Sequence, residues 1–74
     1  MEVEVRLFAV FRIGRFKTRA IEVPDGTHFR DVLKELGIPE EHVSLPLVNG
    51  RHSTLDQQLA ANDVLSIFPA VGGG

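Results

Sequence analysis

Residues 27–39 read THFRDVLKELGIP, and this stretch decides the fold. Its apolar side chains recur at the spacing i, i+3, i+4 and i+7, which is one face of a short helix. They are Phe29, Val32, Leu33 and Leu36. Thr27 is the predicted N-cap, and the negative charge of Asp31 suits the positive end of the helix dipole. Gly37 and Pro39 end the helix, because glycine accepts the left-handed C′ position and proline cannot continue a helix.

Two strands joined by a hairpin are predicted before this helix. Apolar and polar residues alternate along residues 2–9, which is the period of a strand with one face in the core. The residues expected to face inward are Val3, Val5 and Leu7. Residues 18–23 should form the return strand and residues 10–17 the connection. The expected anchors of this connection are Phe11, Ile13 and Phe16. Phe8 falls on the outer face, where it is either covered by a loop or part of a partner surface.

A hairpin and a last strand are predicted after the helix. Residues 45–53 form the hairpin around Asn49-Gly50, because both of these residues tolerate a positive φ. Residues 54–59 are expected to form one helical or 3₁₀ turn. Residues 64–69 should be the last strand, and its alternation leaves Phe68 on the outer face.

This order of elements places the chain in the α+β class. One main helix across one face of a mixed sheet of four to five strands is a β-grasp, or ubiquitin-like, roll. In that arrangement the first and last strands are parallel neighbours, so Phe8 and Phe68 should lie side by side on the open face. Two outward rings together favour a partner surface. We expect the domain to span residues 1–71, followed by a flexible glycine tail at 72–74.

The composition excludes several functional classes. The net charge of −2 argues against nucleic acid as a partner. No apolar run is long enough for a membrane span, and residues 1–4 lack the features of a signal peptide, so we expect a cytoplasmic protein. His28, His42 and His52 have no ligand spacing and Cys is absent, so no metal site is expected. A basic cluster is interpreted as a solvated loop; it consists of Arg12, Arg15, Lys17 and Arg19.

The reactive group that remains is the carboxylate of Gly74. A free carboxylate is a poor electrophile, but a mixed anhydride with AMP makes its carbonyl open to attack. Sulfur attack would give a thiocarboxylate, and amine attack would give an amide. Gly72 and Gly73 suit entry into a narrow channel, because they have no Cβ. With no Cys in the chain, any sulfur would be carried on the terminal carbonyl.

These features resemble the ubiquitin-like sulfur carriers of the MoaD and ThiS type. The resemblance covers the whole chain. It rests on the Asn49-Gly50 hairpin, on Asp63-Val64 before the last strand, and above all on the ending FPAVGGG at residues 68–74. That ending, together with Leu7-Phe8-Ala9, favours the MoaD branch.

The resemblance implies a carrier that is not itself an enzyme and binds no cofactor. An E1-like adenylyltransferase of the MoeB or ThiF type would use ATP to adenylate Gly74, and a sulfur donor would then form the thiocarboxylate. The charged tail would enter the large subunit of molybdopterin synthase, which puts the sulfur into molybdopterin for a molybdenum or tungsten cofactor. In the ThiS branch the partner would be thiazole synthase, and the sulfur would go to the thiazole of thiamin. Partner contacts carried over from the family are Phe8, Phe68, Pro69 and Val71. A further contact, usually apolar, aligns with His52.

Two other functions stay open at this point. The activated carboxylate could be passed to lysines of other proteins, as in archaeal ubiquitin-like modifiers. Chains of this protein on itself would have few sites, since Lys17 and Lys34 are its only lysines. The domain could also be a plain interaction module whose glycines are a spacer.

Overall fold

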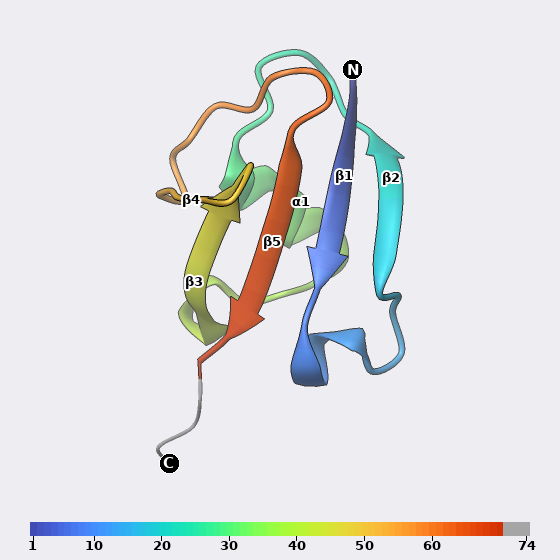
Figure 1. Ribbon diagram of the computed structural model, residues 1–74, viewed down its shortest axis with the longest axis vertical. Coiled ribbons are helices and arrows are strands. Elements are labelled where there is room, and N and C mark those ends of the chain that lie inside the picture. The colour runs from blue at the N-terminus through green and yellow to red at the C-terminus, as the bar shows by residue number, and fades with distance from the viewer. Residues whose placement is uncertain (71–74) are drawn as a thin grey trace.

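The computed structural model describes residues 1–70, and within them five strands form one mixed sheet (Figure 1). The strands are β1 (Glu2–Leu7), β2 (Thr18–Glu22), β3 (Val43–Val48), β4 (Arg51–His52) and β5 (Val64–Pro69). The helical elements are α1 (Phe29–Leu36) and the 3₁₀ helices η1 (Ala9–Arg12) and η2 (Glu40–His42). The strand order is β2-β1-β5-β3-β4, with β1 and β5 parallel and the other neighbours antiparallel. The predicted β-grasp fold is confirmed.

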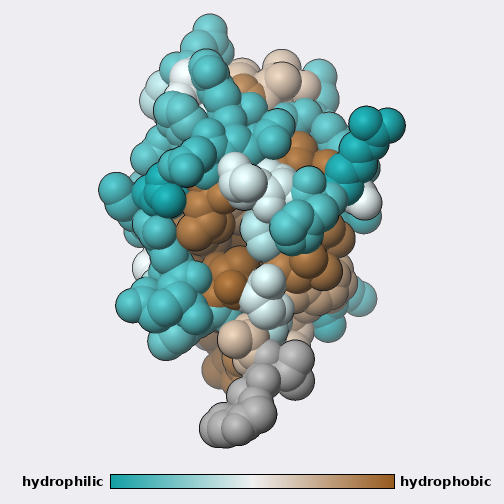
Figure 2. All heavy atoms as spheres, turned by 90° about the vertical axis from the view of Figure 1, so that its left-hand side faces the viewer, coloured by the Kyte–Doolittle hydropathy of each residue, from teal (hydrophilic) through white to brown (hydrophobic). Residues whose placement is uncertain are grey.

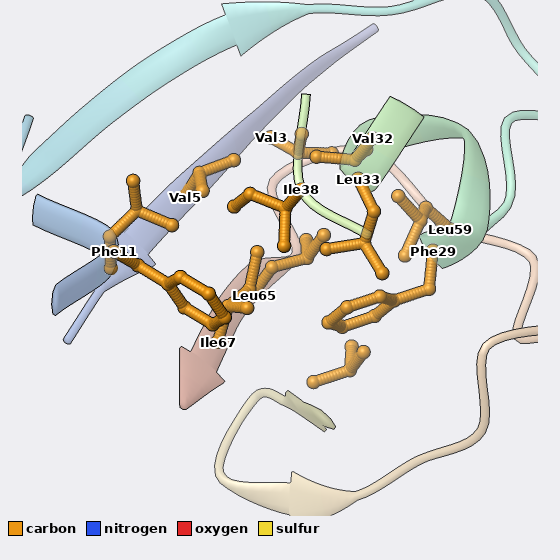
Figure 3. Packing of buried hydrophobic residues seen from close by; sticks show 12 residues of the cluster. Val3, Val5, Phe11, Phe29, Val32, Leu33, Ile38, Leu59, Leu65 and Ile67 are labelled. Atoms are coloured by element: carbon orange, nitrogen blue, oxygen red, sulfur yellow. The ribbon is translucent and has the colours of Figure 1, made fainter. Parts of the chain in front are cut away.

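The core lies between α1 and the inner face of the sheet (Figure 3). Its buried hydrophobic residues are Val3, Val5, Leu7, Phe11, Phe29, Val32, Leu33, Ile38, Val48, Leu59, Leu65 and Ile67. Burying one large side chain of this kind stabilises a fold by about 1.5–3 kcal/mol relative to leaving it exposed. The strand alternation therefore fixes which face of the sheet receives α1. Among the described residues, no helix covers the opposite face, which we call the open face (Figure 1).

The N-cap of α1 is His28, one residue later than predicted. Thr27 does not cap the helix, because its hydroxyl donates to the carbonyl of Pro24 (2.7 Å) and closes the preceding turn. The N–H of His28 donates to Oδ2 of Asp31 (2.9 Å), so Asp31 stabilises the first turn as expected. Gly37 ends the helix with φ 71°, the left-handed conformation predicted for it.

Residues 54–59 form a loop with one turn of the predicted 3₁₀ type, in which the N–H of Gln57 donates to the carbonyl of Thr54 (3.1 Å). The carbonyl of Gln57 accepts the N–H of Phe29 (2.9 Å). The carbonyl of Leu55 accepts the N–H of Arg30 (3.0 Å). These N–H groups belong to the first turn of α1, which has no acceptors of its own for them. The loop therefore uses its carbonyls to complete α1 and not to form a helix.

The connection after β1 differs from the prediction at Ile13. β1 ends at Leu7, because Ala9 adopts φ 52° and the chain turns into η1. Phe11 is buried, as predicted, but Ile13 is 74% exposed and anchors nothing. The loop is held instead by Arg15, whose guanidinium donates to the carbonyls of Leu36, the last residue of α1, and of its C-cap Gly37, at 3.1 and 3.4 Å. Such contacts are favourable because a cation meets the negative end of the helix dipole.

A polar network holds the β3–β4 hairpin to the start of β5. Asn49 has φ 54° at the predicted turn. Its Nδ2 donates to Oδ1 of Asp63 (2.9 Å), and its Oδ1 accepts the N–H of Val64 (2.9 Å). The second carboxylate oxygen of Asp63 accepts the N–H of Ala60 (2.8 Å). The network fixes the start of β5 at Val64.

Candidate partner-binding face and chain end

Phe8 and Phe68 form a stacked aromatic pair on the open face. Leu7 pairs with Ile67 in the parallel register of β1 and β5, so the next residue on each chain points outward at the same level. The ring centroids lie 4.1 Å apart and the ring planes differ by 9°. The guanidinium of Arg12 lies 5.3 Å from the centroid of Phe8, within the range of a cation–π contact. The prediction that the two rings lie side by side is confirmed.

Two leucines of β3 extend this apolar surface. Leu45 lies opposite Phe68 in the β3–β5 ladder, and Leu47 lies opposite Ser66. Directly opposed residues share a face of the sheet, so we define the apolar face as Phe8, Leu45, Leu47 and Phe68. Leu45 is 38% exposed. Figure 2 shows the β3–β4 side of the molecule, where hydrophobic surface gathers between hydrophilic borders.

The sequence analysis missed Leu45 and Leu47. The signal was present as the alternation Leu45-Pro46-Leu47. Alternation alone does not say which face is the core face in a strand whose partners are unknown. The register against β5 decides it here, because it opposes Pro46 to the buried Ile67.

His52 lies apart from the aromatic pair. It is an exposed residue of β4, the edge strand, and it pairs with Leu47. Its strand is therefore separated from β5 by β3. An imidazole at this place gives the edge of the apolar face a polar group.

The end of β5 is fastened to the start of β3. Pro69 pairs with Val43, and Oγ of Ser44 donates to the carbonyl of Pro69 (2.9 Å). The N–H of Ala70 donates to the carbonyl of His42 (2.8 Å), so pairing continues one residue beyond the strand. The predicted site residues Val71, Gly72, Gly73 and Gly74 lie outside the described residues. The predicted domain boundary between residues 71 and 72 therefore stays a prediction.

The described residues offer little other chemistry. Among residues 1–70, no group of three or more His, Cys, Asp or Glu side chains could hold a metal ion. In the same part of the chain, no helix has the length and apolarity needed to cross a membrane. Hydrogen bonds from Arg30 to Asp56 and Glu40 raise the pKa of Arg30. The backbone N–H of His28 lowers the pKa of Asp31. Both shifted groups belong to α1, on the face of the sheet opposite the apolar face.

Comparison with known proteins decides the family. The model of the ThiS family matches residues 5–74. The chain belongs to the ThiS family. It is thus a ubiquitin-like protein of the MoaD and ThiS sulfur-carrier type, as the resemblance of its sequence indicated. The match includes both rings of the stacked pair and the glycine ending.

Solved structures of other proteins support this family assignment. The putative molybdopterin converting factor subunit 1 from Pyrococcus furiosus is 31% identical, with a TM-score of 0.79 over 96% of this chain and 99% of that one. SAMP1 from Haloferax volcanii is 27% identical, with a TM-score of 0.78 over all of both chains. A chain in the complex of subunits 1 and 2 of the molybdopterin-converting factor from Helicobacter pylori 26695 is 28% identical. Its TM-score is 0.65 over all of both chains.

Proposed function

We propose that this protein carries sulfur as a thiocarboxylate on Gly74 and donates it to molybdopterin synthesis as the small subunit of a synthase. An E1-like adenylyltransferase of the MoeB or ThiF type would activate the chain with ATP. A large synthase subunit would then receive the charged chain. The protein itself is a co-substrate in this proposal and not an enzyme.

The observation that carries the proposal is the position of the Phe8–Phe68 stack. Phe68 is followed by only two described residues, Pro69 and Ala70, before the chain continues into Val71 and the three glycines. Ordering a glycine costs more backbone entropy than ordering any other residue, about 1–2 kcal/mol each. A partner that orders the tail needs a favourable contact elsewhere, and the apolar face offers one beside the chain end.

The chemistry requires the terminal carboxylate and two partners. The carboxylate oxygen of Gly74 would attack the α-phosphorus of ATP and release pyrophosphate, which gives an acyl-adenylate. A persulfide sulfur on the donor would attack the carbonyl carbon, and AMP would leave. Reductive cleavage of the resulting acyl disulfide by a thiol of the activating system gives the thiocarboxylate. Because the chain has no Cys, no internal thiol competes for the activated carbonyl.

Similarities to known proteins support the choice of acceptor. The Pyrococcus furiosus and Helicobacter pylori relatives are named for molybdopterin conversion, and the second was solved with its subunit 2. The ending Phe68-Pro69-Ala70-Val71 and the start Leu7-Phe8-Ala9 resemble the MoaD branch. The thiazole of thiamin, made with thiazole synthase, is the alternative sulfur acceptor, because the matching family model is that of ThiS.

The test is a mass measurement on the intact protein. Incubation with ATP, the E1-like adenylyltransferase from the same genome, a cysteine-derived persulfide donor and a thiol reductant should raise the mass by about 16 Da, the exchange of one oxygen for sulfur. A variant that lacks Gly74 is the matched control and should stay unchanged. Sulfur transfer to the molybdopterin precursor bound by the large synthase subunit, with water supplying the oxygen, should then return the mass to its starting value. An unchanged wild-type mass with active adenylyltransferase would refute the proposal.

The second candidate function is protein modification. It is favoured by the likeness to SAMP1, and a second solved structure of that protein is named as a small archaeal modifier protein. The same activated carbonyl would then be attacked by a lysine amine, which forms an isopeptide bond and releases AMP. In the mass experiment this function would appear as a product heavier by a whole protein. A product heavier by about 16 Da alone, with sulfur transfer to the molybdopterin precursor on the synthase, argues for the carrier.

A further inference from the structure

Positive charge in this protein is concentrated in one segment. Residues 5–21 contain five of the eight Lys and Arg residues and none of the ten Asp and Glu residues. The five are Arg6, Arg12, Arg15, Lys17 and Arg19. All the acidic residues lie in the remainder of the chain, so a protein of net charge −2 has one strongly basic region on an acidic body. Such asymmetry steers and orients a charged partner.

The basic region is built on a loop that is fixed to the fold. We define the basic loop as residues 9–17. Phe11 is buried in the core, and the N–H of Leu7 donates to the carbonyl of Lys17 (3.0 Å). Arg15 ties the loop to carbonyls at the C-terminal end of α1. A loop held at three points presents its outer side chains in a defined arrangement, unlike the solvated loop that the sequence suggested.

The outer side chains of the basic loop are apolar as well as basic. Val10 is 60% exposed and Ile13 is 74% exposed, the two most exposed large hydrophobic residues among those described. The guanidinium of Arg12 lies 5.3 Å from the centroid of the Phe8 ring. The guanidinium of Arg19, on the adjoining β2, lies 4.5 Å from the centroid of the Phe16 ring in the loop. Within residues 1–70, Arg12, Arg15, Lys17 and Arg19 make no ion pair with a carboxylate. Their positive charge is therefore open to a partner.

The position of the loop indicates which partner would meet it. The loop lies at the end of the molecule where β5 finishes, and η1 packs against β5 (Figure 1). A partner that contacts the end of β5 therefore has this loop beside it. The β3–β4 hairpin, with the exposed Arg51, lies toward the other end of the sheet.

We propose that the basic loop is a second docking surface for the large synthase subunit, next to the apolar face, which it meets where Arg12 lies over Phe8. The subunit would present an apolar socket for Ile13 and Val10, bordered by carboxylates that face Arg12 and Lys17. This inference rests on the proposed function, because that function supplies the partner. The acidic remainder of the chain repels the same carboxylates, so the charge pattern admits one orientation of the carrier.

The experiment measures binding of the full-length protein to the purified large synthase subunit from the same genome. Ile13→Ser should weaken the affinity about five- to ten-fold, because a buried apolar anchor is lost. Lys17→Glu should slow association several-fold at low salt, and the difference should shrink at about 0.5 M salt. Arg51→Glu is the matched control, since it makes the same change in net charge away from the loop. Thermal unfolding should be nearly unchanged in all three variants, because each side chain is exposed.

Each result supports or overturns the inference. If both loop variants bind like wild type while Phe68→Ala does not, the loop is no docking surface and the proposed function stands. An equal loss with Arg51→Glu would mean that net charge alone matters, which also overturns it. If Ile13→Ser abolishes self-association in sedimentation but leaves binding intact, the surface belongs to a second copy. If wild type neither binds the subunit nor gains about 16 Da with the adenylyltransferase, the proposed function fails as well.

Discussion

The ring of Phe68 lies flat against the ring of Phe8, with 4.1 Å between centroids and 9° between planes. The contact joins the residue after β1 to the last part of β5, two neighbouring interior strands of the sheet. Neither ring faces α1, so the stack is not part of the main core. An aromatic pair held at this place gives the chain end a rigid apolar neighbour.

Phe68→Ala should impair partner binding more than folding. The affinity for the large synthase subunit should fall about 30-fold or more, as expected when a central aromatic anchor is removed. The free energy of unfolding should fall by about 1–2 kcal/mol, less than for a fully buried Phe, because the ring is half-buried. Calorimetric titration and urea denaturation measure the two effects. Val64→Ala, at the other end of β5 on the same face, should leave the affinity unchanged.

The stack itself can be tested with a double-mutant cycle. Phe8→Ala, Phe68→Ala and the double variant should show a coupling of about 0.5–1.5 kcal/mol in the free energy of unfolding. Additive effects of the two substitutions would mean that the rings do not contact each other in solution. In that case the apolar face would be two separate patches.

Asn49→Ala should destabilise the protein by about 2–4 kcal/mol. The substitution removes the hydrogen bonds with Asp63 and Val64 and places alanine at a φ of 54°. Asn49→Gly keeps the backbone conformation at no steric cost, so it should lose only the hydrogen-bond part, about 1 kcal/mol less than Asn49→Ala. Urea denaturation of both variants separates the two contributions. Equal stability of wild type and Asn49→Gly would show that the network contributes nothing.

Sequence patterns predicted the parts of the fold that depend on local alternation. The last strand, Val64–Pro69, has the predicted limits because five of its residues alternate between core and surface and Pro69 follows them. The Phe8–Phe68 pair followed from the same alternation once the two strands were taken as parallel neighbours. Both predictions needed only the period of a strand and one topological assumption.

The errors arose where a distant segment satisfies a local need. Thr27 has the chemistry of an N-cap, yet residues 55–57 supply the acceptors for α1, so its hydroxyl serves the preceding turn. Ile13 is apolar, yet Arg15 holds the loop by reaching the end of α1. Leu45 was assigned to no face, because the register of β3 depends on β5. Such long-range partners leave no local pattern in the sequence.

The stability of the protein should fall on acidification partly because of Asp31. The N–H of His28 holds the pKa of Asp31 below its ordinary value of 3.8. The unfolded state therefore takes up this proton at a higher pH than the folded state. The stabilisation is present above the unfolded pKa of 3.8 and is lost as the pH falls from there through the lower folded pKa. Thermal unfolding across that window should show a smaller decline in Asp31→Asn than in wild type.

The control for this pH dependence is Glu35→Gln, which removes an exposed carboxylate from the same helix. It should leave the acid-induced decline nearly as in wild type. If Asp31→Asn and wild type lose stability in parallel on acidification, the contact with His28 is not formed in solution.

Ser44→Ala should loosen the chain end without affecting the rest of the sheet. The hydroxyl of Ser44 donates to the carbonyl of Pro69, one residue before the N–H that Ala70 donates to His42. Loss of one such exposed hydrogen bond, about 1 kcal/mol, should speed amide exchange at Ala70 about five-fold and leave Ile67 unchanged. Hydrogen exchange followed by NMR measures both amides. The control is Ser66→Ala, which removes a serine hydroxyl from β5, the strand that pairs with β3. If the Ala70 amide of wild type exchanges as fast as in an unfolded peptide, the chain end is not held on β3, and the glycine tail does not start from a fixed point beside Phe68.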